Sequence, residues 1–116
     1  MSSLPQNQVA DAISSTLERL SQTGILSIPN RPGIVVEPPK RPEWGDFSSN
    51  VAMLLASQVR QAPLKIAETL AIELRRECAD LFTHVAVASP GFLNFTLHSS
   101  RWIQILESIR SPVVRA

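Results

Sequence analysis

An aromatic ring and an amide stand close together near the end of this sequence. Residues 89–97 read SPGFLNFTL, and alternation along a strand would divide their side chains between two faces. One face carries Phe92, Asn94 and Thr96, and the other carries Leu93, Phe95 and Leu97. The second set suits a core. Because a buried amide needs hydrogen-bond partners, we expect the first set to face solvent.

A solvent-facing ring beside an amide suggests one kind of chemistry. The ring of Phe92 offers a stacking surface and the amide of Asn94 offers hydrogen bonds, and proteins combine these two elements to bind an unpaired RNA base. The alternative is structural, with Phe92 folded over the Pro–Gly turn or a helix so that it closes the core. Spacing alone leaves both interpretations open.

Basic residues would add contacts to phosphate groups. The candidates are Arg41, Arg60, Arg75 and Arg101. Eleven basic residues against ten acidic ones give a net charge of +1, so any contact with a nucleic acid must be local. The adjacent pair Arg75 and Arg76 fits the solvated face of a helix better than a phosphate clamp.

The sequence lacks the residue patterns of metal sites, phosphate-binding loops and catalytic centres. His84 and His98 have no cysteine or carboxylate at metal-ligand spacing, so we expect no metal site. The four glycines are dispersed rather than gathered into a phosphate-binding loop, and no catalytic constellation is present. Cys78, the one cysteine, excludes an internal disulfide and fits a small residue at the core boundary in a reducing compartment. We therefore expect a binding domain without a cofactor of its own.

The length and hydropathy of the chain favour one domain in the cytoplasm. A chain of 116 residues, 44% of them hydrophobic, can bury a single core. The N-terminus lacks the basic and apolar regions of a signal peptide, and the longest apolar run, residues 51–56, is too short to span a bilayer. No membrane partner is expected.

Three helices are expected before the strand that contains Phe92 and Asn94. Helical spacing predicts the first between Pro5, which suits an initial turn, and Gly24, which suits a C-terminal stop. Gly45 permits a tight turn and Asp46 is suited to cap a second helix, which should begin near Phe47 and be the most buried of the three.

A third helix is expected over residues 63–78. Its inner stripe and its solvent-facing residues follow from the same spacing. The stripe is Ile66, Leu70 and Leu74, and the solvent-facing side includes Lys65, Glu68, Glu73, Arg75 and Arg76.

Three strands complete the core, and they are predicted from β-branched runs and alternation. Residues 34–37 read IVVE and predict one strand, while the alternating residues on either side of Ser89, Pro90 and Gly91 predict two more, joined by a turn. The chain should thus form an α+β fold, in which helices pack on one face of a small antiparallel sheet and the other face stays open to water.

Three sequence blocks carry a family resemblance. They are WGDFSSNVAMLLA at residues 44–56, APLKIAETLA at residues 62–71 and SPGFLNFTL at residues 89–97. Together and in this order they resemble the N-terminal additional domain of arginyl-tRNA synthetases. The resemblance implies a tRNA-binding N-terminal domain over residues 1–98. It also implies that residues 99–116 start a linker helix toward a catalytic domain that this chain does not contain.

The resemblance also implies roles for single residues. Phe92 and Asn94 align with the family positions that meet a base in the D-loop of the tRNA. The structural signature of the family matches Gly45, Asp46, Phe47, Asn50 and Gly91, with Asn50 as a polar tie to the preceding loop. The parent enzyme would ligate arginine to its tRNA with ATP and Mg²⁺, whereas this chain would supply binding without catalysis. Its partners would be the tRNA and the rest of the synthetase.

A second hypothesis belongs to another class. A free-standing relative with the same fold would act as a protein-interaction or regulatory module, docking through the open sheet face or through the segment around Trp102.

Overall fold

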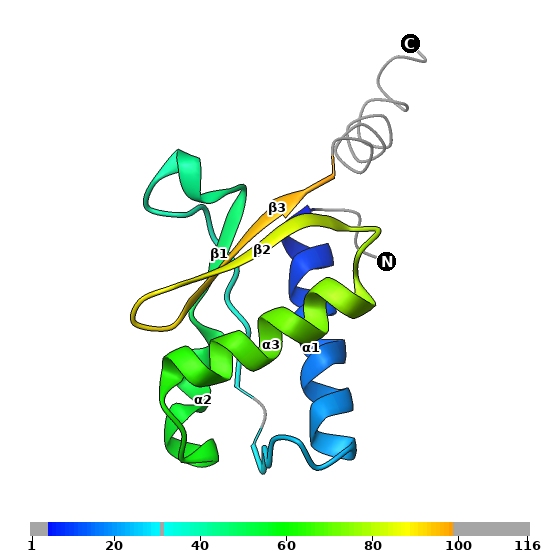
Figure 1. Cartoon of the computed structure of the whole chain (residues 1–116), viewed down its shortest axis with the longest axis vertical. Helices are drawn as coiled ribbons and strands as arrows, with labels where there is room; N and C mark the ends of the chain where they lie inside the picture. Colours follow the sequence, from blue (N-terminus) through cyan, green and yellow to red (C-terminus); the bar gives the residue numbers. More distant parts are fainter. Residues whose placement is uncertain (1–4, 31, 99–116) are drawn as a thin grey trace.

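Helices and a small sheet make up the part of the chain that the structure describes (Figure 1). The structure is a computed structural model that describes residues 5–30 and 32–98. In chain order the elements are α1 (Pro5–Gln22), the 3₁₀ helix η1 (Pro42–Trp44), β1 (Phe47–Ser49), α2 (Val51–Val59), α3 (Pro63–Glu77), β2 (Phe82–Ala88) and β3 (Phe92–Leu97). The helix expected over residues 99–116 lies outside the described residues.

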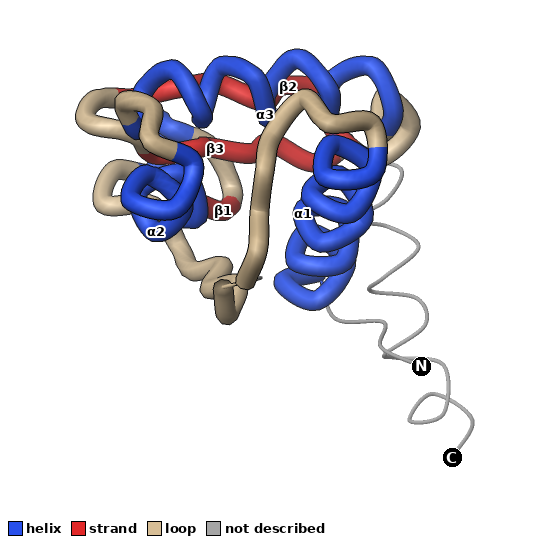
Figure 2. Tube along the Cα trace, turned by 90° about the horizontal axis from the view of Figure 1, so that it is seen from below, coloured by secondary structure: helices blue, strands red, loops and turns tan. Residues whose placement is uncertain are grey.

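The sheet is antiparallel with the strand order β1-β3-β2, so the last of the described strands lies in the middle. Phe95 of β3 stands opposite Phe47 of β1 on one side and Val85 of β2 on the other. All three are buried with the apolar stripes of the helices. Figures 1 and 2 show α2 and α1 near opposite ends of α3. The expected α+β fold is confirmed.

Helices α1 and α3 follow their sequence patterns closely. The helix α1 begins at Pro5 and ends two residues before Gly24, whose φ of +80° suits glycine. Its buried residues are Val9, Ile13, Thr16, Leu17 and Leu20. Helix α3 begins at Pro63 as predicted, and its inner stripe of Ile66, Leu70 and Leu74 has no exposed surface. Both predictions are confirmed.

The second helix begins later than predicted. Residues from Phe47 form strand β1, and α2 starts only at Val51. Asp46 does not cap the helix. Its Oδ2 accepts a hydrogen bond from the backbone N–H of Leu97 at 2.9 Å, and its own N–H donates to the carbonyl of Phe95 at 2.7 Å. Pairing with β3 outweighs the local helix signal here, because a strand is stabilised by neighbours that sequence pattern does not show.

Helix α2 also differs in burial and capping. It buries three of its nine residues, Val51, Ala52 and Leu55, whereas α3 buries six of its fifteen, so α2 is not the most buried helix. Asn50 occupies the N-cap position without a side-chain capping bond, and its Oδ1 is buried with no hydrogen-bond partner among the described residues. That oxygen therefore does not make the expected polar tie.

The strand expected over residues 34–37 is reduced to a single bridge. Glu37 pairs with Ser48 through two backbone hydrogen bonds of 3.0 and 2.7 Å. Pro38 and Pro39 follow immediately, and because proline has no N–H, the ladder cannot continue past them.

Glu73 was expected to face water, but it is only 8% exposed. Arg76 donates from one nitrogen to both of its carboxylate oxygens, at 2.9 and 3.0 Å, and the Nε of Arg19 lies 4.0 Å away. Since helical spacing places position 73 next to the apolar stripe, α1 covers this carboxylate and supplies one of its cations.

Two glycines, Gly45 and Gly91, stand where chain segments approach closely. A Cβ at Gly45 would lie 2.6 Å from the carbonyl oxygen of Phe95, and the φ of this residue is +129°. A Cβ at Gly91 would lie 2.7 Å from the Cβ of Pro63. Gly45 thus lets the chain pass close to β3, and Gly91 seats the β2–β3 turn against the start of α3.

The hydrogen bond from the Leu97 N–H to the Asp46 carboxylate should contribute measurably to the free energy of unfolding. We expect Asp46→Ala to lower the free energy of unfolding by roughly 1–3 kcal/mol, because the N–H of Leu97 loses a charged acceptor. Urea denaturation followed by far-UV circular dichroism measures the loss. The matched control is Asp11→Ala, at an exposed position of α1. Equal stability of the two variants would contradict the assigned role.

Candidate nucleic-acid interface

The ring of Phe92 lies outside the core. It is half-buried, and it is not a member of the core cluster formed by the described residues. It lines a cavity of about 200 Å³ between β3 and the segment that precedes β1. The lining residues are Glu37, Pro38, Pro39, Lys40, Trp44, Ser48 and Phe92. An aromatic side chain predicted to be available for binding thus lies in a small surface cavity.

Two cations lie over the aromatic rings of this cavity. The Nζ of Lys40 is 5.6 Å from the centroid of the Phe92 ring, and the Cζ of Arg41 is 5.7 Å from that of Trp44. Both distances fall within the range of cation–π attraction. Trp44 is 38% exposed, and Arg41 also pairs with Glu43 at 3.7 Å. The cavity therefore combines aromatic surfaces with two cations and two carboxylates, Glu37 in the lining and Glu43 paired with Arg41.

Asn94 is not exposed as predicted. Only 4% of the residue is accessible, because β3 is the central strand and Asn94 lies between Ser48 of β1 and Ala86 of β2. Its Oδ1 is buried and has no hydrogen-bond partner among the described residues. The expectation failed because β1 was assigned to a helix, which left one side of β3 uncovered in the predicted sheet.

The four candidate phosphate contacts do not form one group. Arg41 lies beside the cavity, next to Lys40. Arg60 ends α2 in the left-handed conformation, with φ of 61°. Arg75 belongs to the other edge of the sheet, as described below, and Arg101 lies outside the described residues. The structure thus brings Arg41 together with Phe92 and separates Arg75 from them.

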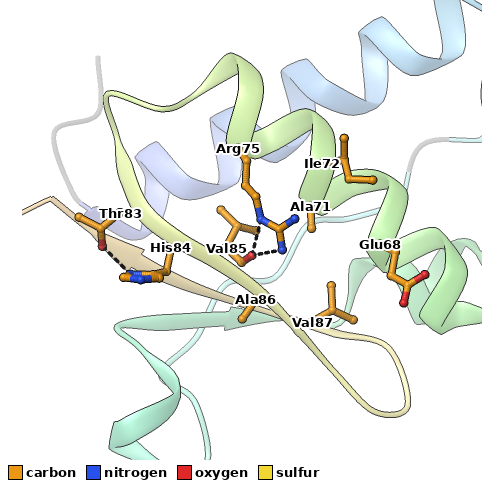
Figure 3. Close-up of a pocket in the computed structure, with 9 residues that line it drawn as sticks. All are labelled: Glu68, Ala71, Ile72, Arg75, Thr83, His84, Val85, Ala86 and Val87. Atoms are coloured by element: carbon orange, nitrogen blue, oxygen red, sulfur yellow. Dashed lines mark hydrogen bonds between the residues drawn. The ribbon is translucent and has the colours of Figure 1, made fainter.

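A second cavity lies between α3 and the free edge of β2 (Figure 3). It measures about 720 Å³ and is lined by residues 83–87 of β2 and by Glu68, Ala71, Ile72 and Arg75 of α3. Arg75 was expected to be solvated, but it donates from Nε and Nη2 to the carbonyl of Val85 at 2.9 and 2.6 Å. Its guanidinium therefore covers an edge carbonyl that would otherwise be open to another strand.

We also searched the described residues for a metal site, a reactive thiol and a membrane-spanning helix. Within residues 5–30 and 32–98, no group of three or more His, Cys, Asp or Glu residues is placed to hold a metal ion. Burial raises the pKa of the half-buried Cys78 thiol, which keeps it protonated and unreactive near neutral pH. No helix in this part of the chain is long and apolar enough to cross a membrane.

Sequence reasoning did not single out Lys40 and Trp44, which the structure places in the lining of this cavity. Both lie in the stretch PPKRPEWG at residues 38–45, where basic residues and an aromatic alternate with prolines. That composition was the available signal, because exposed aromatics interleaved with basic residues are typical of surfaces that bind single-stranded nucleic acids.

Relatives of known activity share most of this chain. The arginine–tRNA ligase of Geotalea uraniireducens (strain Rf4) is 42% identical over 99 residues, which is 85% of this chain and 18% of the relative. The arginine–tRNA ligase of Citrifermentans bemidjiense is 38% identical over 104 residues, or 90% of this chain and 19% of the relative. The chain thus spans about a fifth of the length of these relatives.

Solved structures share the fold. The crystal structure of arginyl-tRNA synthetase from Plasmodium falciparum matches with a TM-score of 0.69 at 13% identity, over 88% of this chain and 17% of that one. The Thermus thermophilus arginyl-tRNA synthetase matches with a TM-score of 0.59 at 22% identity, over 85% and 15%. The family described as "Arginyl tRNA synthetase N terminal domain" matches residues 7–97. The chain therefore belongs to the family of arginyl-tRNA synthetase N-terminal domains.

Proposed function

We propose that this chain is the tRNA-binding domain of an arginine–tRNA ligase and contacts the D-loop of the tRNA through the β3 face. The observation that carries the proposal is the position of Phe92, whose ring lies outside the core in a cavity with two cations at its rim. Stacking on an aromatic ring stabilises binding of an unpaired base by roughly 1–3 kcal/mol.

Asn94 would supply base selectivity. A buried acceptor without a partner costs roughly 1–3 kcal/mol, so a base amino group that reaches the Asn94 Oδ1 would recover that energy. Because Asn94 is 4% exposed, the neighbouring side chains must shift before a base can reach it. Phe92 is thus the first contact and Asn94 the deeper one.

The remaining steps of the activity would belong to the rest of the ligase. ATP and Mg²⁺ would bind there, and this chain would position the tRNA without contributing a catalytic group. With one stacked base and a few charges, the domain alone should bind tRNA weakly, with a Kd around millimolar.

An NMR titration of the chain tests this proposal. We expect arginine tRNA to shift the amide resonances of β3 around Phe92 and Asn94 at about 50 mM salt, and to shift them less at about 200 mM. A non-cognate tRNA should leave these resonances in place. The variant Phe92→Ala should abolish the cognate shifts, since it removes the stacking surface. If neither tRNA moves these resonances at low salt, the proposal is wrong.

One observation favours the protein-interaction alternative. Ile72 is 57% exposed beside the β2 edge, in the cavity of Figure 3, where a partner segment would find apolar surface. A tRNA titration that leaves β3 unchanged, followed by loss of partner binding in Ile72→Ser, would favour this function.

A further inference from the structure

We infer that the cavity of Figure 3 is an interface between two copies of this chain, in which the β2 strands pair across a two-fold axis and extend the sheet. The name edge groove is used below for this cavity, whose lining includes residues 83–87 of β2 and Glu68, Ile72 and Arg75 of α3. The inference is independent of the proposed function, because no residue of β2 lines the cavity that holds Phe92.

The backbone of β2 offers hydrogen bonds along its outer side. In the strand order β1-β3-β2, a neighbouring strand covers one side of β2 and leaves the other free. Arg75 reaches the carbonyl of Val85 from α3, and Phe95, opposite Val85, has its own carbonyl bonded to Asp46 on the β1 side. The N–H and C=O of one residue in an antiparallel ladder point the same way. Val85 therefore directs both groups toward the free edge.

The free edge is suited to pair with a copy of itself. Val85 is the central residue of β2, which runs from Phe82 to Ala88. Two antiparallel copies of this strand, related by a two-fold axis, place Val85 opposite Val85, and the pair would exchange both N–H to C=O hydrogen bonds. One surface patch then serves both copies, as in most dimers of identical chains.

The exposed face of α3 is matched to the same axis. Ile72 is 57% exposed, and Figure 3 shows it between Glu68 and Arg75 along the helix. Those two charged residues are seven positions apart, or about 10.5 Å along a helix, so they do not pair within one copy. When two α3 helices run antiparallel with Ile72 facing Ile72, Glu68 of each copy lies opposite Arg75 of the other.

Pairing of the copies also opens the edge that Arg75 closes. In the single chain this guanidinium donates from Nε and Nη2 to the carbonyl of Val85, at 2.9 and 2.6 Å. A carboxylate forms stronger, charge-assisted bonds with a guanidinium than a neutral carbonyl does. Glu68 of the second copy therefore draws Arg75 away from Val85, and the freed carbonyl accepts a bond from the other β2. In a chain without a second copy, Arg75 keeps the edge covered.

The charges of the edge groove favour a second copy over other occupants. The groove brings the carboxylate of Glu68 and the guanidinium of Arg75 to either side of an apolar residue. A phosphate backbone or an acidic peptide would gain attraction at Arg75 and meet repulsion at Glu68, and a basic peptide would meet the reverse. A second copy carries the same two charges in the reversed order that the antiparallel alignment requires.

Sedimentation equilibrium of the chain tests the interface at concentrations from roughly 10 µM to 1 mM, which cover weak and moderate dimers. We expect the average mass to rise toward twice that of the monomer. Ile72→Ser should weaken the dimer by roughly tenfold or more, because it removes an apolar contact from both copies. The matched control is Ile25→Ser, at an isoleucine 54% exposed outside the edge groove. A chain that stays monomeric throughout, or equal effects of the two substitutions, would overturn the inference.

An exchange of charges tests the alignment of the two helices. Glu68→Lys should weaken the dimer by roughly tenfold, because it brings like charges together across the axis. Asp11→Lys makes the same change of net charge at an exposed position of α1 and should leave the dimer intact. The double variant of Glu68→Lys with Arg75→Glu restores opposite charges and should recover most of the affinity. If it binds no better than Glu68→Lys alone, the antiparallel alignment is wrong.

Hydrogen exchange followed by NMR locates the contact on β2. The amide of Val85 should exchange more slowly as the chain concentration rises, because it donates to the second copy. The amide of Val35, a residue 52% exposed outside the edge groove, should exchange at a rate independent of concentration. If the mass doubles while exchange at Val85 stays constant, the copies meet elsewhere and the pairing of the β2 strands is wrong.

Discussion

Phe95→Ala is expected to lower the free energy of unfolding by roughly 3–5 kcal/mol, the usual cost of truncating a fully buried ring. Phe95 has no exposed surface, lies in the central strand, and packs against Phe82 with ring centroids 5.0 Å apart. Domains of this size are typically stable by only about 5–15 kcal/mol, so the loss is a large fraction of the total. Urea or thermal denaturation followed by circular dichroism measures it.

The control lies on the same strand. Phe92→Ala removes an identical ring from the opposite face of β3, outside the core cluster, and should change stability by less than about 1 kcal/mol. Binding should respond in the opposite sense, since Phe92→Ala loses tRNA contacts while any folded fraction of Phe95→Ala retains the Phe92 ring. Comparable destabilisation by the two substitutions would show that Phe92 is part of the core.

Gly45→Ala should destabilise the chain by roughly 2–5 kcal/mol, because backbone strain and overpacking act together. The backbone φ of +129° disfavours any residue with a Cβ, and that atom would lie 2.6 Å from the Phe95 carbonyl oxygen and 2.9 Å from the Thr96 Oγ1. The first obstacle is backbone of the central strand, so it cannot rotate away. Chemical denaturation gives the magnitude.

Gly33→Ala is the matched control for that substitution. An added Cβ at Gly33 would meet nothing within 4 Å, and its φ lies outside the range that favours glycine. We expect a change within about 0.5 kcal/mol. If Gly45→Ala is as benign as Gly33→Ala, the close approach of this turn to β3 is not a feature of the folded chain.

Local sequence patterns correctly predicted the helices and strands whose signals lie within their own residues. The helices α1 and α3 carry apolar stripes several turns long, with proline at the start of each, and both form as expected. The hairpin of β2 and β3 was found because alternation on both sides of a Pro–Gly turn is hard to produce otherwise. The core side of β3 followed from the same alternation, and Leu93, Phe95 and Leu97 are buried.

Distant contacts account for the failures. Strand β1 is only three residues long, and its pairing with β3 stabilises it. Its own sequence carries no strand pattern and was therefore interpreted as the start of α2. Missing β1 led directly to the wrong exposure of Asn94. The cavity beside Phe92 could not be predicted either. Trp44 and Phe92 line it together, and no spacing rule connects residue 44 with residue 92.

The position of β3 in the middle of the sheet bears on how the chain folds as it is synthesised. The ribosome releases β1 early, yet β1 pairs with the last of the described strands, and the bond between Asp46 and Leu97 joins residues 51 positions apart. Until β3 emerges, the helices can pack on one another but not on the completed sheet, and part of their apolar surface remains exposed. Closing so long a loop also makes this step slow relative to helix formation. The pairing of β1 with β3 therefore completes the sheet late, after the hairpin of β2 and β3 has emerged.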